Sequence, residues 1–98
     1  MIFVIDNLKY DTDKMEKIAN VKKWYKSDSW VLQGLTGEEL GYVYDCELWK
    51  SKKGRWLITR ETDAKHYAEA IDEEDAKALL LRYDLEKYEE LYGEVEEA

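Results

Sequence analysis

In the first two thirds of the chain, apolar and polar residues tend to alternate, which is the pattern of strands that bury one face. Ile2 to Ile5 form a short run of β-favouring residues, Asp6 and Asn7 are typical turn residues, and 8–10 then predicts a return strand. The chain is therefore expected to begin with a small β-hairpin.

A short helix is predicted directly after this hairpin. The side chains of Asp11, Thr12 and Asp13 can accept hydrogen bonds from the free amides of a first helical turn. Glu16 follows three residues after Asp13, as in a capping box, so we expect a helix near 13–19.

The next two predicted strands lie at 20–26 and 30–35, with a break at 27–29 and turn residues at 36–39. The strongest β pattern follows at 42–61.

The predicted hairpin at 42–61 has strands 42–50 and 55–61 joined by Ser51-Lys52-Lys53-Gly54. A type I turn followed by Gly54 in the left-handed region would close it. This closure would pair Lys50 with Trp56, Trp49 with Leu57, Leu48 with Ile58, and Glu47 with Thr59. It would also place Cys46, Leu48, Trp56 and Ile58 on one face, and Trp49 and Leu57 on the other. Apolar residues on both faces indicate that the hairpin is central in its sheet.

After residue 61 the apolar spacing changes to three and four residues, which predicts helices. The segment 65–71 fits either a loop or a short strand. Asp72 is a suitable N-cap for a helix at about 72–83, and the negative charges of acidic residues in its first turn interact favourably with the helix dipole. The stripe expected to face the sheet consists of Ala76, Leu79, Leu80 and Tyr83.

A second helix is predicted at about 85–92, with Asp84 as its cap and Gly93 as its stop. Its inward residues would be Leu85, Tyr88, Leu91 and Tyr92. Residues 94–98 are expected to form a frayed tail.

These elements predict a single domain, 1–98, of the α+β class: a small antiparallel sheet with a central 42–61 hairpin and both helices packed on one face. The expected core consists of Leu48, Trp56, Ile58, Ala76, Leu79, Leu80 and Tyr83.

Charge divides the chain into two parts. Residues 1–62 carry 11 Lys/Arg and 10 Asp/Glu, whereas residues 63–98 carry 4 Lys/Arg and 13 Asp/Glu, and the net charge of the whole chain is −8. Such an asymmetry bears on partners rather than on fold. It favours a cationic protein partner and opposes direct binding of nucleic acid.

The sequence offers little for catalysis. One Cys and one His, Cys46 and His66, cannot build a disulfide or a zinc site of the usual kind, and no phosphate-binding glycine loop is present. We therefore expect no enzyme activity, no metal and no cofactor. A lone Cys fits a reducing cytosol, and the apolar N-terminus is too short for a signal peptide, so we expect a cytoplasmic protein. No apolar run approaches membrane-spanning length, so we expect no membrane partner. The oligomeric state is open between a monomer and a homodimer, which an exposed aromatic face could form.

Two charged features remain as candidate binding surfaces. The first is an acidic helical surface for a protein partner, whose residues are Glu73, Glu74, Asp75, Glu86, Glu89 and Glu90. The alternative is the basic hairpin tip, with Lys50, Lys52, Lys53 and Arg55 flanked by two Trp residues, since cations beside aromatics can hold a nucleic-acid strand. Either set can also be a solvated surface that keeps the protein soluble.

Three stretches also carry a resemblance: Lys9-Tyr10-Asp11-Thr12, the hairpin sequence 47–57, and Ile71-Asp72-Glu73-Glu74-Asp75-Ala76 with the following 77–80. Together they resemble a group of short uncharacterised proteins from Gram-positive bacteria and their phages and plasmids. Residues 13–15 depart from the group pattern, and 27–40 match nothing in it. The resemblance implies no catalytic residues. It implies a genomic association with mobile elements, whose small acidic proteins often inhibit host defence nucleases.

The leading hypothesis is therefore a small acidic, non-enzymatic binding protein: an anti-defence, anti-CRISPR-like inhibitor of a nucleic-acid-handling host complex such as a CRISPR effector. The alternative is a nucleic-acid-associated regulator that uses the basic 50–55 tip.

Overall fold

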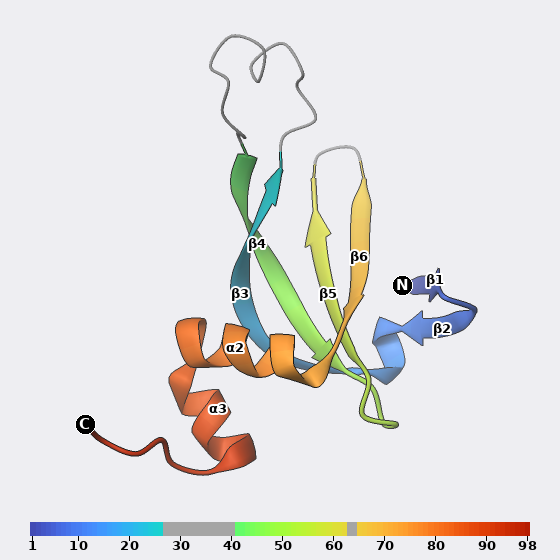
Figure 1. Cartoon of the computed structure of the whole chain (residues 1–98). Coiled ribbons are helices and arrows are strands. Elements are labelled where there is room, and N and C mark those ends of the chain that lie inside the picture. The colour runs from blue at the N-terminus through green and yellow to red at the C-terminus, as the bar shows by residue number, and fades with distance from the viewer. Residues whose placement is uncertain (27–40, 63–64) are drawn as a thin grey trace, which may run out of the picture.

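A computed structural model describes residues 1–26, 41–62 and 65–98. Its strands are β1 (Ile2–Ile5), β2 (Leu8–Asp11), β3 (Glu16–Lys26), β4 (Gly41–Lys50), β5 (Trp56–Glu61) and β6 (His66–Ile71), and its helices are α2 (Glu73–Tyr83) and α3 (Leu85–Tyr92) (Figure 1). This arrangement confirms the predicted α+β class. The strand predicted at 30–35 and the turn at 36–39 lie outside the described residues.

The main sheet is antiparallel with the order β3-β4-β5-β6, so β4 and β5 are its central strands. The register pairs Leu48 with Ile58 and Lys50 with Trp56, as the predicted hairpin requires. Of the two alternatives for 65–71, the strand is the one found, and β6 pairs with β5 along its whole length.

The turn between β4 and β5 depends on Gly54. Its φ is +84°, and its amide donates to the carbonyl oxygen of Ser51 at 2.9 Å. Ser51 in turn faces Arg55, because the Ser51 amide donates to the Arg55 carbonyl oxygen at 2.8 Å. The left-handed backbone expected at this position is therefore present.

Replacing Gly54 with Val should lower the free energy of unfolding by about 1–2 kcal/mol, because a β-branched residue strongly disfavours a left-handed backbone. An added Cβ would meet no atom within 4 Å, so this loss comes from the backbone alone. Thermal unfolding measures it, with Gly54→Asn as the control, since Asn tolerates this region better. Equal melting temperatures for wild type and Gly54→Val would contradict the prediction.

The N-terminal hairpin also forms as predicted. Asp6 and Asn7 have φ values of 52° and 64°, which suits a tight two-residue turn between β1 and β2. The Thr12 amide donates to the Met1 carbonyl oxygen at 2.9 Å and closes the open end of the hairpin.

The helix predicted near 13–19 is wrong. Asp11 does accept a hydrogen bond from the Asp13 amide at 3.1 Å, but the turn that follows is a single 3₁₀ turn at Thr12–Lys14. From Glu16 onward the backbone pairs with β4, with a bulge between Lys17 and Ala19. Pairing with a central strand and burial of side chains outweigh the local capping signal.

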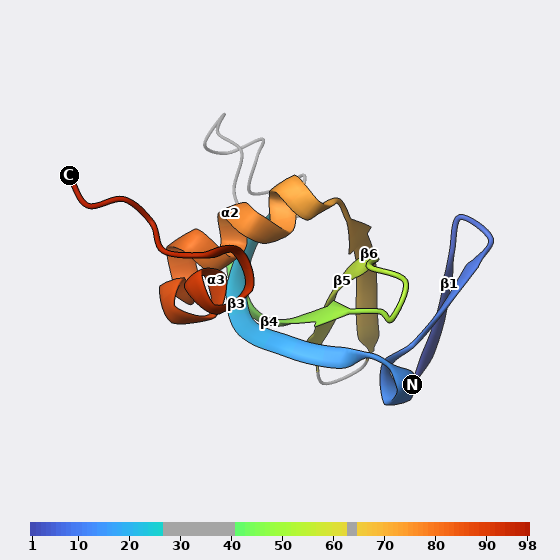
Figure 2. The ribbon, with the colours of Figure 1, turned by 90° about the horizontal axis from the view of Figure 1, so that it is seen from below.

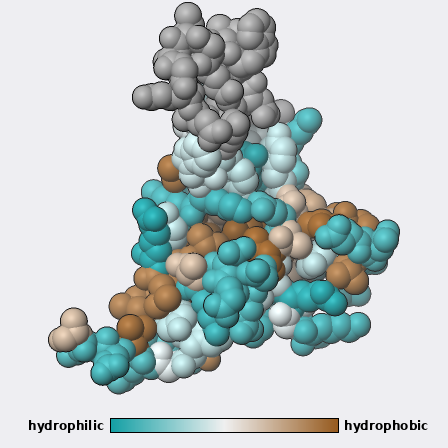
Figure 3. All heavy atoms as spheres, viewed as in Figure 1, coloured by the Kyte–Doolittle hydropathy of each residue, from teal (hydrophilic) through white to brown (hydrophobic). Residues whose placement is uncertain are grey.

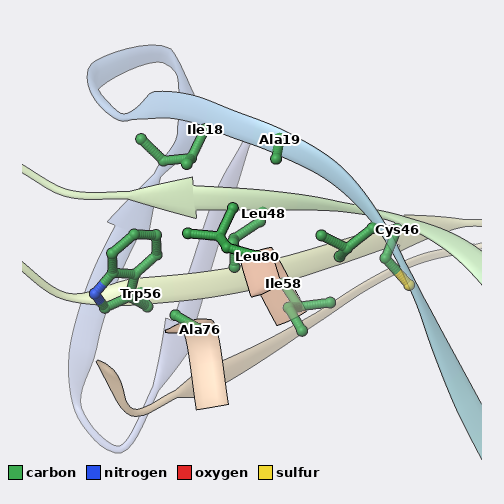
Figure 4. Packing of buried hydrophobic residues seen from close by; sticks show 9 residues of the cluster. Ile18, Ala19, Cys46, Leu48, Trp56, Ile58, Ala76 and Leu80 are labelled. Carbon is green, nitrogen blue, oxygen red and sulfur yellow. The ribbon is translucent and has the colours of Figure 1, made fainter. Parts of the chain in front are cut away.

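The core lies between one face of the sheet and the helices. In Figure 4, Leu48, Trp56 and Ile58 from the central hairpin point toward Ala76 and Leu80 of α2. These five side chains are between 0% and 2% exposed. Most of the predicted core is therefore confirmed, and Leu79 packs against it while only partly buried.

Three apolar residues that were expected to point inward are exposed instead. Tyr83 is 37% exposed, Leu85 47% and Leu91 38%, so their assignment to the interior was wrong. Helix α2 contacts both β3 and α3, whereas α3 packs chiefly through Tyr88 and Tyr92. The apolar stripe on each helix is wider than the surface available to cover it.

The opposite face of the sheet is partly covered by the N-terminal hairpin, which lies beside β6 and away from the helices (Figure 2). Between the N-terminal hairpin and this face of the sheet is a cleft of about 210 Å³, with Met1 and Phe3 on one side and Trp49 and Thr59 on the other. The Trp49 Nε1–H donates to Thr59 Oγ1 at 2.9 Å. Leu57 belongs to this face and is 0% exposed.

Candidate functional site

The acidic helical surface is built on two capped helices. Asp72 accepts a hydrogen bond from the Asp75 amide at 2.8 Å, and Asp84 accepts one from the Lys87 amide at 3.1 Å. Both caps are those that the sequence predicts, and Gly93 ends α3 with a φ of +97°. The predicted acidic site residues therefore lie on fixed helical turns.

Two lysines partly neutralise these carboxylates. Lys77 Nζ lies 3.6 Å from Glu73 and 3.9 Å from Glu74, and Lys87 Nζ lies 3.4 Å from Glu90. Such exposed pairs contribute little to stability and leave the surface strongly acidic. Asp75 and Glu86 have no cation within salt-bridge distance among the described residues.

The packing of Tyr92 brings the end of α3 beside the beginning of α2. Lys77 Nζ lies 4.8 Å from the centre of the Tyr92 ring. Burial raises the pKa of the Tyr92 hydroxyl above its usual value, and the nearby charges of Glu73 and Glu74 raise it further. The first-turn carboxylates of α2 thus share one end of the helix pair with Tyr92, whereas Glu86 lies at the junction of the two helices.

Exposed apolar side chains accompany these charges. Leu81, Tyr83 and Leu85 lie within five residues of one another at the α2–α3 junction, and each is more than a third exposed. Figure 3 shows hydrophobic surface at the end of the molecule where α2 meets α3. Leu91 and Val95 add exposed apolar surface near the end of α3. The helices therefore present apolar groups within an acidic surround.

The basic tip is the second predicted site, and the structure enlarges it. Lys52, Lys53 and Arg55 line a depression of about 400 Å³ together with two further cations, Lys9 and Lys14. Lys50 lies apart from this depression, with its Nζ 5.2 Å from the centre of the Trp56 ring. Lys9 and Lys14 were missed at the sequence level because they come from the N-terminal segment, about 40 residues away in the chain.

The flanking aromatics do not form an exposed stacking platform at this tip. Trp56 is 2% exposed, on the helix-covered face, and Trp49 lies half-buried on the opposite face beside Thr59. The tip therefore offers charge without base-stacking surface.

A cluster not anticipated from the sequence lies farther along the helix-facing side of the sheet. The Arg60 guanidinium carbon lies 4.2 Å, 4.4 Å and 4.1 Å from the ring centres of Tyr25, Tyr44 and Tyr67. Burial raises the pKa of Tyr25 from 10.0 to about 12, so its hydroxyl keeps its proton further into the alkaline range than a free tyrosine does. The residues come from four strands, and no local spacing in the sequence could reveal them.

The chain has one Cys and one His, and these two residues, Cys46 and His66, lie on opposite faces of the sheet. Cys46 is 2% exposed on the helix-facing side, and burial raises the pKa of its thiol. His66 on β6 is the strand partner of Glu61 on β5, and both side chains project from the opposite face of the sheet. The His66 Nδ1 lies 3.0 Å from a Glu61 carboxylate oxygen. Since the Cys46 and His66 side chains project from opposite faces, they do not form a thiol–imidazole pair.

Within residues 1–26, 41–62 and 65–98, no group of three or more His, Cys, Asp or Glu side chains is placed to hold a metal ion. The same residues include no helix with both the length and the apolar character needed to cross a membrane. Comparison of the chain with protein-family models, with curated proteins and with solved structures gave no match.

Proposed function

We propose that this protein is a small, non-enzymatic binding protein whose acidic helical surface docks on a basic protein partner. In the setting that the resemblance implies, it is an anti-defence protein of a mobile element. Its target would be a nucleic-acid-handling host complex in the cytoplasm, such as a CRISPR effector. It would need no cofactor, and it would occupy cationic side chains that otherwise hold guide or target strands.

The observation that supports this proposal most is the exposure of Leu81, Tyr83 and Leu85 beside the carboxylate of Glu86. Protein interfaces commonly join a buried apolar centre to a polar rim, and the charges in the rim steer the encounter. A merely solvated acidic helix has no need of exposed Leu and Tyr at its end. The combination therefore favours a partner that is apolar at the centre of its site and basic around it.

Reversing Glu86, Glu89 and Glu90 to Lys should slow association with the partner by about tenfold or more, because charge mainly steers encounter. Binding of the wild type should also weaken as salt rises, since exposed charges are screened. The probe is a purified, guide-loaded CRISPR effector, with rates measured by biolayer interferometry across a salt series and cleavage measured in parallel.

A matched control reverses three exposed carboxylates elsewhere, Asp13, Asp45 and Glu61. Three reversals add six positive charges, so either variant changes the net charge from −8 to −2. Circular dichroism checks that both remain folded. The Lys52→Glu/Lys53→Glu variant completes the set. If that variant loses the partner while the helix variant keeps it, the basic tip is the interface and the acidic-surface proposal fails.

A further inference from the structure

Some lysines and arginines of this chain lie within salt-bridge distance of a carboxylate, and others do not. On β3, Lys17 lies 3.9 Å from Glu47, Lys22 lies 3.7 Å from Asp45, and Lys23 lies 2.9 Å from Glu69. The depression beside the 51–54 turn is different. None of its five cations has a carboxylate within 4.0 Å among the described residues.

This depression, the basic furrow, lies between β2 and the turn that joins β4 to β5. Its cations are Lys9, Lys14, Lys52, Lys53 and Arg55. Asp11 is the single carboxylate among its lining residues, and its side chain is engaged with the Asp13 amide. The furrow is therefore a local concentration of about four positive charges on a protein whose net charge is −8.

The furrow is open to solvent. A neighbouring depression shares Lys14, Met15, Ser51 and Lys52 with it, but that depression is also lined by two carboxylates, Asp13 and Glu16, so most of the excess positive charge lies in the furrow. An open furrow suits a chain of successive anions better than a single enclosed ion. It is bordered by a two-stranded hairpin and a tight turn, which form a narrow surface compared with a nucleic-acid duplex.

We propose that the basic furrow binds the phosphate backbone of a single-stranded nucleic acid. A nucleic-acid strand carries a condensed atmosphere of counterions, and cationic side chains that neutralise its phosphates release those counterions to the solvent. Phosphate contacts carry no sequence information, and Tyr10, the furrow's aromatic residue among those described, is 6% exposed. The furrow therefore holds strands without preference for base. It is separate from the acidic helical surface and does not depend on that surface having a partner.

The net charge of −8 opposes a strand at long range, so binding is weak at physiological salt and is measured best at low salt. Five phosphate contacts predict a slope of about −3.5 for log K against log salt, and thus a loss of affinity of about 100-fold between 50 and 200 mM salt. Fluorescence anisotropy of labelled oligothymidine and oligoadenosine measures this slope on the full chain.

The deciding variant is Lys52→Gln/Lys53→Gln, which should reduce the slope to about −2.1 and the loss of affinity to about 20-fold over the same salt range. Lys17→Gln/Lys22→Gln is the matched control, because it removes the same charge from β3 and should keep the wild-type slope. All four lysines are at least partly exposed, so both variants should fold.

Two further measurements distinguish a single strand from other ligands that carry phosphate. A duplex of the same length should bind more weakly than the single strand, and pyrophosphate at the same phosphate concentration should not displace the strand. No binding at about 50 mM salt, equal slopes for the wild type and Lys52→Gln/Lys53→Gln, or displacement by pyrophosphate would each overturn the proposal.

Discussion

Replacing Leu80 with Ala is expected to lower the free energy of unfolding by about 2–5 kcal/mol. The Leu80 side chain is 0% exposed and lies in the cluster that joins α2 to the sheet. Truncation removes buried methyl groups and leaves a cavity that the rigid sheet cannot fill. Because this cluster is the contact between the helices and the strands, the loss should affect the whole fold.

The matched control for this prediction is Leu81→Ala. Leu81 is the next residue of the same helix and is 44% exposed, so the change in helix propensity is the same but little burial is lost. The control should change stability by no more than about 0.5 kcal/mol. Urea unfolding followed by tryptophan fluorescence measures both variants. Equal midpoints for the two would show that α2 does not dock through Leu80.

The second large effect is expected at Leu57, on the other side of the sheet. Leu57→Ala should also destabilise the fold by about 2–5 kcal/mol, because the side chain is 0% exposed. The helices lie on the opposite face, so we attribute this burial to the N-terminal hairpin and to Trp49 beside it. The prediction therefore tests whether the N-terminal hairpin is part of the cooperative unit.

Val43→Ala is the control for Leu57→Ala. Val43 is on β4, on the same face of the sheet, and is 61% exposed. Its truncation should change the urea midpoint only slightly. Hydrogen exchange adds a second measurement: in Leu57→Ala, amides of β1 and β2 should lose protection before those of β4. A near-zero loss of stability would mean that the hairpin leaves this face open to solvent.

Short-range interactions made much of the fold predictable. The closure at Gly54, the turn at Asp6 and Asn7, and the caps at Asp72 and Asp84 each involve residues at most four positions apart. Their chemistry can therefore be interpreted before any tertiary contact is known. The register of the central hairpin follows from its turn, and the burial of Leu48 and Ile58 follows from that register.

The features that the sequence predicted wrongly are those that long-range interactions determine. Residues 16–19 form strand rather than helix because they pair with β4, about 30 residues away. Tyr83 and Leu85 fit an apolar helical stripe, but the surface that could cover them is occupied by other residues. Periodicity reports which residues could be buried, and only the packing partner determines which of them are.

The candidate sites, too, depend partly on short-range and partly on long-range interactions. The acidic excess of the last third and the lysines of the 51–54 turn are visible in the sequence, because each group is continuous along the chain. The basic furrow also requires Lys9 and Lys14, and these reach the tip only because the N-terminal hairpin folds beside it. Composition and local spacing by themselves determine the central hairpin, the tight turns, the helix caps and the charge of this protein. The pairing of strands and the docking of hairpin and helices decide which charges meet and which apolar side chains remain exposed, because both depend on contacts between residues far apart in the chain.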